Sequence, residues 1–399
     1  MSRLEAYREI APQGSVEFLL RMAEKIGKKR ILHMNSTKLG GGVAEILRSL
    51  VPLLESVGLE AQWDVITGNE EFFSTTKAFH NALQGQEQRI SPEMLQNYLE
   101  INRENAKRLS LEADFVIIHD PQPAALIESR RNKKGKWVWR CHIDVSQPQR
   151  KVWDFLRQFV VKYDAAIFSL PRFAQRLPIP QFLIYPSIDP LSDKNRGISP
   201  QELDQILSRL KISLDKPILL QVSRFDRFKD PLGVIQAYRL VKKHHDLQLI
   251  LAGGGATDDP EGEAVLAEVR QAAQDDPDIR VLVLPPDANL EINALQRVAT
   301  IVLQKSLREG FGLTVAEAMW KGKPVIGGFT GGITVQLVYG VTGFTVNSVE
   351  GTAFRIHYLL DNPEAMARMG QDAREFVRRN FLITRHLGDY LALMSYMGR

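Results

Sequence analysis

The sequence has little cysteine: Cys141 is the single cysteine among 399 residues. One thiol cannot form a disulfide within the chain and cannot supply a cysteine-rich metal site. A chain without disulfides is typical of a reducing compartment, so we expect the cytoplasm. Stability must then come from a packed core, and a composition of 44% apolar and 25% charged residues suits a globular protein with one.

Long apolar runs are also absent. The longest, such as Phe115–Ile118 and Ile218–Val222, are far shorter than the roughly 20 residues that cross a bilayer. The stretch Met1–Gln13 carries several charges and no apolar segment of signal-peptide type. We therefore expect no secretion signal and no membrane partner.

A strong excess of one charge is missing too. The chain has 51 basic and 47 acidic residues, a formal charge of +4, which weakly favours small anionic ligands. Basic residues form one short run without interleaved aromatics, which favours a solvated loop and no nucleic-acid partner. The run comprises Arg130, Arg131, Lys133, Lys134 and Lys136.

Short apolar runs alternate with helical patterns along the whole chain, and this alternation predicts an α/β protein with parallel sheets. The helix 43–54, for example, places its apolar residues on one face. In the first half the predicted strands are Arg30–Met34, Ala61–Val65, Phe115–His119, Trp137–His142 and Ala165–Phe168. In the second half they are Ile218–Val222, Leu247–Leu251, Ile279–Leu284, Thr300–Leu303, Pro324–Ile326 and Gly343–Val346. We expect two doubly wound domains.

The domain boundary is predicted where prolines surround the polar run Ser192–Arg196, a composition typical of a linker. We place an N-terminal domain at 1–190 and a C-terminal domain at 191–379. The stretch Ala365–Arg399 is predicted to be helical throughout, with 380–399 crossing back to the first domain. Because α/β domains bind ligands at the carboxyl ends of their strands, we expect a cleft between the two domains.

The segment 37–43, T-K-L-G-G-G-V, follows the first predicted strand and opens a helix near Val43. Gly41 and Gly42 would let backbone amides approach an anion or a sugar at the helix amino terminus. A tight strand-to-helix turn explains the local pattern equally well.

Two further strands of the first half end in a histidine followed by an aspartate. One is F-V-I-I-H-D-P-Q-P, which contains His119 and Asp120, and the other is W-R-C-H-I-D, which contains His142 and Asp144. We predict that these four residues, with Gln122, bind a polyol or sugar. Zinc is the rival use of such residues, but no pair of histidines has a familiar short ligand spacing, so we predict no metal.

In the second half, V-S-R-F-D-R-F-K-D places Arg224 and Lys229 in the loop after a strand. A guanidinium and an ammonium five positions apart suit a diphosphate and would stabilise it as a leaving group. An exposed basic turn is the alternative.

The most informative motif is R-E-G-F-G-L-T-V-A-E, in which Glu309 and Glu317 lie eight residues apart. We predict a helix that begins near Leu313, whose free amides point toward phosphate, with Glu309 beside a sugar and Glu317 beside a ribose. The predicted donor-binding residues here are Gly310, Phe311, Gly312, Leu313, Thr314 and Glu317. A further glycine group, Gly327–Gly332, follows the next strand and is predicted to approach the same ligand closely.

Glu309 and Glu317 with G-F-G-L between them resemble the E-x7-E signature of retaining glycosyltransferases of family 4, and the similarity extends over most of the chain. That resemblance implies the GT-B fold, a donor nucleotide held by the C-terminal domain, no obligatory metal, and no tightly bound cofactor, with Mg²⁺ at most stimulatory. It also implies that Arg224 and Lys229 bind the diphosphate and that Glu317 binds the ribose. Glu309 and His142 would lie at the transferred sugar, so we predict Glu309, His142, Arg224 and Lys229 as catalytic.

Within that family, H-D-P-Q-P-A-A-L-I, W-R-C-H-I-D and F-H-N-A-L-Q-G are similar to the glycosyl-transferring synthases that make trehalose. The resemblance implies transfer of glucose from UDP-, ADP- or GDP-glucose to free glucose, which makes α,α-trehalose. It departs from the family at 338–342, V-Y-G-V-T, which lacks the usual acidic residue before the glycine.

Three other functions stay open. A retaining trehalose phosphorylase would use phosphate in place of a nucleotide, and a non-catalytic nucleotide-sugar-binding protein would share the fold. A nicotinamide dehydrogenase fits less well, because no G-x-G-x-x-G follows the first strand of either domain. The expected partners are small molecules, and a homodimer stays open.

Overall fold

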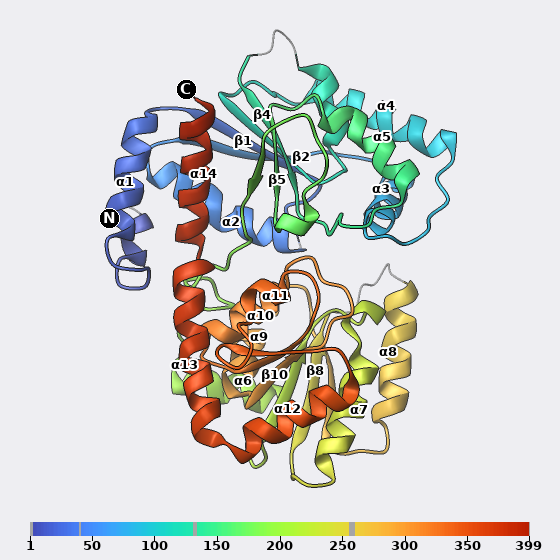
Figure 1. The fold of residues 1–399 in the computed structure, drawn as a ribbon, viewed down its shortest axis with the longest axis vertical. Coiled ribbons are helices and arrows are strands. Elements are labelled where there is room, and N and C mark those ends of the chain that lie inside the picture. The colour runs from blue at the N-terminus through green and yellow to red at the C-terminus, as the bar shows by residue number, and fades with distance from the viewer. Residues whose placement is uncertain (1–2, 40, 131–133, 255–259, 399) are drawn as a thin grey trace. The chain divides into compact units, whose positions relative to one another are not determined.

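The computed structural model describes residues 3–39, 41–130, 134–254 and 260–398 (Figure 1). The chain forms two compact units. Unit 1 comprises Met1–Pro186 and Ile383–Arg399, and unit 2 comprises Ser187–Leu382. These divisions lie within a few residues of the expected domain boundaries.

Unit 1 contains a six-stranded sheet in the order β2-β1-β3-β4-β5-β6, in which all the pairings are parallel. Its strands are β1 (Arg30–Asn35), β2 (Glu60–Val65), β3 (Phe115–His119), β4 (Lys136–Cys141), β5 (Ala165–Phe168) and β6 (Gln181–Leu183). The strand order reverses between β1 and β3, and ligands of doubly wound sheets bind where the order reverses. The loops that follow β1 and β3 therefore form the expected site of this unit.

The helices of unit 1 form two packed groups. In one, α1, α2 and α14 pack on the sheet through an apolar cluster. In the other, α3, α4 and α5 pack through aromatic rings such as Phe79, Tyr98 and Phe155. The helices are η1 (Arg3–Tyr7), α1 (Ser15–Ile26), α2 (Gly41–Ser56), α3 (Glu70–Leu83), α4 (Pro92–Arg108), η2 (Ala124–Ser129), α5 (Arg150–Val160), η3 (Pro171–Phe173) and α14 (Ile383–Met397).

Unit 2 contains a second parallel six-stranded sheet, in the order β12-β11-β10-β7-β8-β9. Its strands are β7 (Ile218–Val222), β8 (Gln248–Gly253), β9 (Ile279–Val283), β10 (Ile301–Gln304), β11 (Val325–Gly328) and β12 (Gly343–Val346). Here the order reverses between β7 and β10. The loops after these two strands contain the cationic and glutamate motifs predicted to bind the donor.

The helices of unit 2 complete its core against this sheet. They are α6 (Pro200–Leu210), η4 (Arg227–Lys229), α7 (Pro231–Lys242), α8 (Pro260–Ala273), α9 (Asn289–Val298), α10 (Leu313–Trp320), α11 (Ile333–Gln336), α12 (Val349–Asp361) and α13 (Pro363–Asn380). Among the helices described in either unit, none is long and apolar enough to cross a membrane.

The prediction of two doubly wound α/β domains is confirmed, and the predicted strands match the observed ones within two residues at each end. The sequence did not reveal β6, an edge strand of three residues in which only the middle one is partly buried. A run so short and so exposed has no apolar pattern to recognise.

The segment Ser192–Arg196, whose composition is typical of a linker, is packed within unit 2. Asn195 is only 1% exposed, because this segment packs on α9. The Asn293 side-chain amide donates to the carbonyls of Asp193 and Arg196 at 2.8 and 3.0 Å. Polar composition indicated solvent exposure, but here the polar groups are satisfied by side chains of a neighbouring helix.

The prediction of one continuous helix over Ala365–Arg399 is wrong. Helix α13 ends at Asn380, and α14 begins at Ile383. Between them Leu382 forms a β-bridge with Ile188, and the Ile188 amide donates to the Phe381 carbonyl at 2.8 Å. The helix breaks where the chain returns from unit 2 to unit 1, and α14 then packs on α1 and α2 as the expected returning helix.

We predict that Leu391→Ala destabilises unit 1 by about 2–5 kcal/mol, because Leu391 is fully buried in the cluster that joins α14 to the sheet. Ala392→Ser, at an exposed neighbouring position of α14, should change stability by less than about 0.5 kcal/mol. Urea unfolding followed by tryptophan fluorescence measures both, because four of the five tryptophans belong to unit 1. Equal stability of the two variants would contradict this role of α14.

Candidate functional site

The loops that follow β7 and β10 are joined by an ion pair between two of the predicted catalytic residues. Lys229 Nζ lies 2.7 Å from Glu309 Oε2, and the two side chains are only 16% and 11% exposed. The same carboxylate oxygen accepts hydrogen bonds from Ser306 Oγ at 3.2 Å and from Gln304 Nε2 at 3.4 Å. Glu309 is therefore fixed in position, with its charge balanced by Lys229.

Arg224 lies in the same loop as Lys229 but is held much less firmly. Its side chain is 65% exposed, and its guanidinium lies 3.2 Å from Asp226 Oδ2. Asp226 also caps η4, since its other oxygen accepts from the Phe228 amide at 2.7 Å. The loop backbone is thus rigid while the Arg224 guanidinium remains accessible to an anion.

Helix α10 begins at Leu313, as predicted, and its amino end is open. Its N-cap, Gly312, has a φ of 80° and no side chain to cap the first amides. Gly310 and Gly312 shape this turn, and Thr314 Oγ1 donates to Gln304 Oε1 at 3.2 Å. Phe311 differs from the other predicted donor-binding residues of this turn, because its ring is buried against Phe381. The Phe311 ring therefore belongs to the packed interior of unit 2.

Glu317 lies inside α10, as predicted, and is almost fully buried at 1% exposure. Its Oε1 lies 3.6 Å from Lys194 Nζ. Its Oε2 has no hydrogen-bond partner among the residues that the structure describes. A buried carboxylate oxygen without a donor is costly, so Glu317 keeps one unsatisfied hydrogen-bond acceptor in the described structure.

Sequence reasoning missed two lysines of this region. Lys194 comes from the segment interpreted as a linker, so its approach to Glu317 had no local signal. Lys305 follows β10 directly, is 5% exposed, and forms an ion pair with Asp230, the N-cap of α7. A polar residue at the end of a central strand was the available signal for Lys305.

The glycines of the 327–332 loop serve packing within the chain. A Cβ on Gly331 would lie 1.6 Å from the Glu309 carbonyl oxygen, and one on Gly328 would lie 2.0 Å from that of Ser306. The Gly332 amide donates to the Gly310 carbonyl at 3.0 Å. The close approach predicted for a ligand is therefore made to the backbone that carries Glu309.

In unit 1, the glycine-rich turn after β1 is exposed. Helix α2 begins at Gly41, two residues earlier than predicted, and both Gly41 and Gly42 are exposed. Gly41 has a φ of 75°, and a Cβ there would meet nothing within 4 Å. Open space above a helix amino terminus fits either ligand approach or a simple turn. Gly40 lies outside the described residues, as do Arg131 and Lys133 of the basic run.

Three histidines of unit 1 form a hydrogen-bonded chain through the end of the sheet. His33 Nδ1 lies 3.0 Å from His119 Nε2, and His119 Nδ1 lies 2.9 Å from His142 Nε2. Burial lowers the pKa of His33 to about 3, and burial also lowers the pKa of His119 and of His142 well below 6.5. All three imidazoles are therefore neutral at pH 7.

The direction in which the three histidines donate their hydrogen bonds follows from His33. Its Nε2 is buried without a partner among the described residues, so a proton there would be an unsatisfied donor. With its proton on Nδ1, His33 donates to His119, which in turn donates from Nδ1 to His142. His142 then carries its own proton on Nδ1, where it can donate to a ligand. His33 lies inside the predicted strand Arg30–Met34 and was not predicted separately as a site residue.

The predicted aspartates near these histidines shape the backbone. Asp120 has a φ of 64°, and its Oδ1 accepts from the His142 amide at 2.7 Å. Burial raises the pKa of Asp120 to about 7. Asp144 Oδ1 accepts from both the amide and the hydroxyl of Ser146, at 2.9 and 2.6 Å. The Gln122 carbonyl accepts from Asn102 Nδ2 at 3.1 Å.

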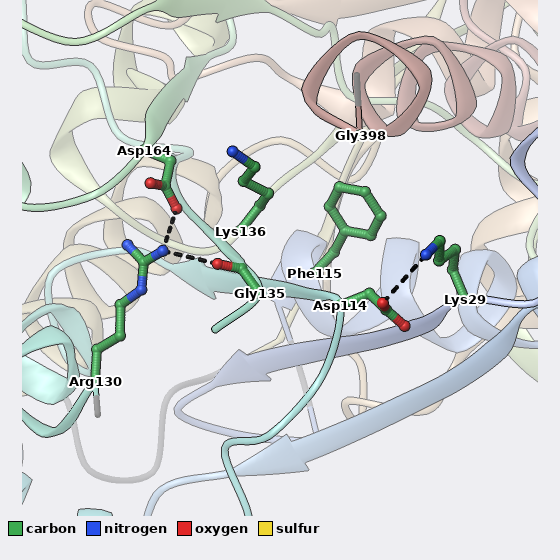
Figure 2. Close-up of a pocket in the computed structure, with 8 residues that line it drawn as sticks. All are labelled: Lys29, Asp114, Phe115, Arg130, Gly135, Lys136, Asp164 and Gly398. Atoms are coloured by element: carbon green, nitrogen blue, oxygen red, sulfur yellow. Dashed lines mark hydrogen bonds and ion pairs between the residues drawn. The ribbon is translucent and has the colours of Figure 1, made fainter. Parts of the chain in front are cut away.

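A separate pocket of about 440 Å³ lies at the opposite, amino-terminal edge of the unit 1 sheet (Figure 2). Its charges are largely paired, Lys29 with Asp114 at 3.4 Å and Arg130 with Asp164 at 2.9 Å. Ligands of doubly wound sheets bind at the carboxyl edge, so this pocket lies away from the candidate site.

The stability of the wild type should fall as the pH rises from about 4 to about 7, because of Asp120. We predict that this fall is absent in Asp120→Asn. The folded wild type keeps a proton on Asp120 up to a pKa of about 7, whereas the unfolded chain loses it near 3.8, so raising the pH through this range destabilises the fold. The difference in unfolding free energy between variant and wild type should grow by at most about 1.4 kcal/mol per pH unit. Chemical denaturation from pH 4 to pH 8 measures it, and a constant difference would contradict the assignment.

We also predict that His142 carries its proton on Nδ1. Two-bond ¹⁵N–¹H correlation spectra of histidine-labelled protein distinguish the two neutral tautomers, and His142→Gln assigns the signal. In His33→Ala the direction of the chain is no longer fixed, so the His142 signal should show tautomer exchange. A proton on Nε2 of His142 in the wild type would contradict the proposed direction.

Family models match both halves of the chain. The model "Trehalose synthase, N-terminal domain" matches residues 33–175, and "Glycosyl transferases group 1" matches residues 204–376. The trehalose synthase of Pyrococcus horikoshii is 49% identical over 99% of this chain and 97% of its own length. The trehalose synthase of Rubrobacter xylanophilus is 42% identical over 98% of this chain and 96% of its own length.

Solved structures share the fold at low sequence identity. The trehalose-6-phosphate synthase OtsA has a TM-score of 0.74 at 14% identity and covers 92% of this chain and 99% of its own. Sucrose-phosphate synthase from Thermosynechococcus elongatus has a TM-score of 0.71 at 17% identity and covers 93% of this chain and 100% of its own. These neighbours confirm the GT-B fold. This chain is similar to the trehalose synthases over nearly its full length. It therefore belongs to the trehalose synthase family and is a trehalose-forming glycosyltransferase.

Proposed function

We propose that the protein transfers glucose from a nucleoside diphosphate glucose to free glucose, with retention of configuration, and so forms α,α-trehalose and a nucleoside diphosphate. The observation that carries this proposal is the grouping of Lys229, Glu309 and the open amino end of α10 where the strand order of unit 2 reverses. A fold neighbour, Anabaena HepE, is described in complex with UDP and glucose, which supports the same ligand classes here.

Unit 2 would bind the donor. Arg224 and Lys229 supply two positive charges to the diphosphate, and the amides of Leu313 and Thr314 supply further donors at a helix amino terminus. Glu317 would accept a hydrogen bond from the ribose through its unpartnered Oε2. The donor enters as a co-substrate, so the protein would need no resident cofactor, and Mg²⁺ would at most stimulate it.

In the reaction the bond between the glucose C1 atom and the diphosphate oxygen breaks, and a bond from C1 to the acceptor oxygen forms on the same face. The acceptor proton passes to the leaving phosphate oxygen. The protein then acts mainly through preorganised charge: Lys229 and Arg224 stabilise the leaving diphosphate, and Glu309 stabilises positive charge on the sugar.

Unit 1 would bind the sugars. His142 would donate from Nδ1 to a sugar hydroxyl, and His119 would hold it in that tautomer. Asp120 fixes the backbone at His142, and Asp144 fixes the turn at Ser146. These two residues, together with Gln122, would contribute to sugar binding by positioning the loops that hold the sugar. An imidazole fixed at one tautomer discriminates between hydroxyl orientations because it can only donate.

We predict that Arg224→Ala and Lys229→Ala each lower kcat by roughly 10²–10³-fold, the effect of removing one charge-stabilising donor in other enzymes. Arg227→Ala is the matched control, since Arg227 lies in the same loop but pairs with Glu268 at 2.7 Å. Steady-state rates of nucleoside diphosphate release measure all three. Equal activity of the Arg224 and Arg227 variants would remove Arg224 from the site.

The test of the function is incubation of the protein with glucose and, separately, UDP-, ADP- and GDP-glucose, with ¹H NMR of the product. α,α-Trehalose from at least one donor supports the proposal. A fungal trehalose phosphorylase, from Pleurotus pulmonarius, is 28% identical over 92% of this chain, which spans 57% of that protein. A parallel reaction of trehalose with inorganic phosphate therefore belongs to the experiment. Glucose 1-phosphate there, with no trehalose from any nucleotide donor, would overturn the proposal.

A further inference from the structure

Unit 2 brings two histidines and a carboxylate together where α7 and α12 end. His357 and Asp361 lie four residues apart on α12, so their side chains share one face of that helix. His245 follows α7, which packs against α12. Each of the three residues offers one ligand atom, and these atoms all lie within 4.8 Å of one another.

The separations suit a small metal ion. His245 Nε2 lies 3.4 Å from Asp361 Oδ1. Around a tetrahedral zinc ion with bonds of about 2.0–2.2 Å, neighbouring ligand atoms lie about 3.3–3.5 Å apart. One pair of atoms is therefore already at the required distance, and the ligand atom of His357 lies within 4.8 Å of both.

The charges at this point also favour a cation. Asp361 is the last residue of α12, where the helix dipole disfavours a carboxylate, and the last turn contains no basic residue. Within the described residues its ion-pair partner is His245, which is charged only when protonated.

We propose that His245, His357 and Asp361 form a binding site for a divalent transition-metal ion of the zinc class. Two imidazole nitrogens and one carboxylate oxygen are a ligand set that suits Zn²⁺ and, by affinity, also Ni²⁺ and Cu²⁺. A fourth position is left for water or for His244, whose ring lies 5.4 Å from that of His357.

The site would act on the structure of unit 2 and not on sugar transfer. Helix α7 begins beside Lys229 and has 12 residues, so its far end lies roughly 18 Å along the helix from the donor-binding loop. A metal ion there would link the end of α7 to the end of α12 and stabilise their packing. Sequence spacing did not reveal the site, because His245 lies more than a hundred residues before His357 and Asp361.

The test is a zinc titration of full-length protein, treated first with EDTA and then dialysed, in competition with a chromophoric chelator. The wild type should bind one zinc ion that is lost in His357→Ala and in Asp361→Asn, with affinity reduced by more than the roughly 10–100-fold typical of outer-shell changes. His80→Ala, a partly exposed histidine of unit 1, is the matched control and should bind like the wild type. Zinc should also raise the Tm of the wild type and of the control only.

Two outcomes would overturn the proposal: absence of zinc binding to the wild type, or equal binding by the wild type, His357→Ala and Asp361→Asn. Asp361 is 62% exposed, so Asp361→Asn should fold even if the histidine variant does not. Cobalt(II) provides a second readout, since a site with two nitrogens and one oxygen gives a visible absorption band. That band should disappear in His245→Ala and persist in His80→Ala.

Discussion

The ion pair between Lys229 and Glu309 is the interaction on which the donor side of this protein depends. It joins the loop after β7 to the loop after β10 at 2.7 Å, with both side chains largely buried. Loss of either partner would leave a buried charge uncompensated, which typically costs several kcal/mol. The backbone at Glu309 is equally constrained, because Gly331 leaves no room for a side chain beside its carbonyl. The carboxylate that we propose to face the transferred sugar is thus held from two sides.

Much of this arrangement was predictable from the sequence. Buried strands such as Phe115–His119 are recognisable as apolar runs, and the carboxyl ends of parallel strands gather polar residues at one edge. That rule identified His119 and Arg224 as site candidates. The motif R-E-G-F-G-L-T-V-A-E identified Glu309 and placed Glu317 inside a helix that begins at Leu313. The family resemblance then assigned a chemistry that the residues alone left open.

The rest depends on contacts that no local pattern encodes. His33 was hidden inside a strand, and its hydrogen bond to His119 appears only when β1 and β3 pair. Lys194 approaches Glu317 from a segment whose polar composition suggested a linker between the domains. The break between α13 and α14 is set by a bridge between Ile188 and Leu382, which are far apart in the sequence. In each case tertiary pairing decided what composition and periodicity could not.

We propose that Glu309 restrains Lys229 until a diphosphate competes for it, while Glu309 itself contributes to transfer. Calorimetric titration of UDP into the wild type and into Glu309→Gln tests this most directly, because the variant keeps the shape of the side chain and removes its charge. The variant should bind UDP as tightly as the wild type or more tightly, although it should form trehalose far more slowly. Weaker UDP binding by the variant would contradict this proposal, because Lys229 would then need Glu309 in order to bind phosphate.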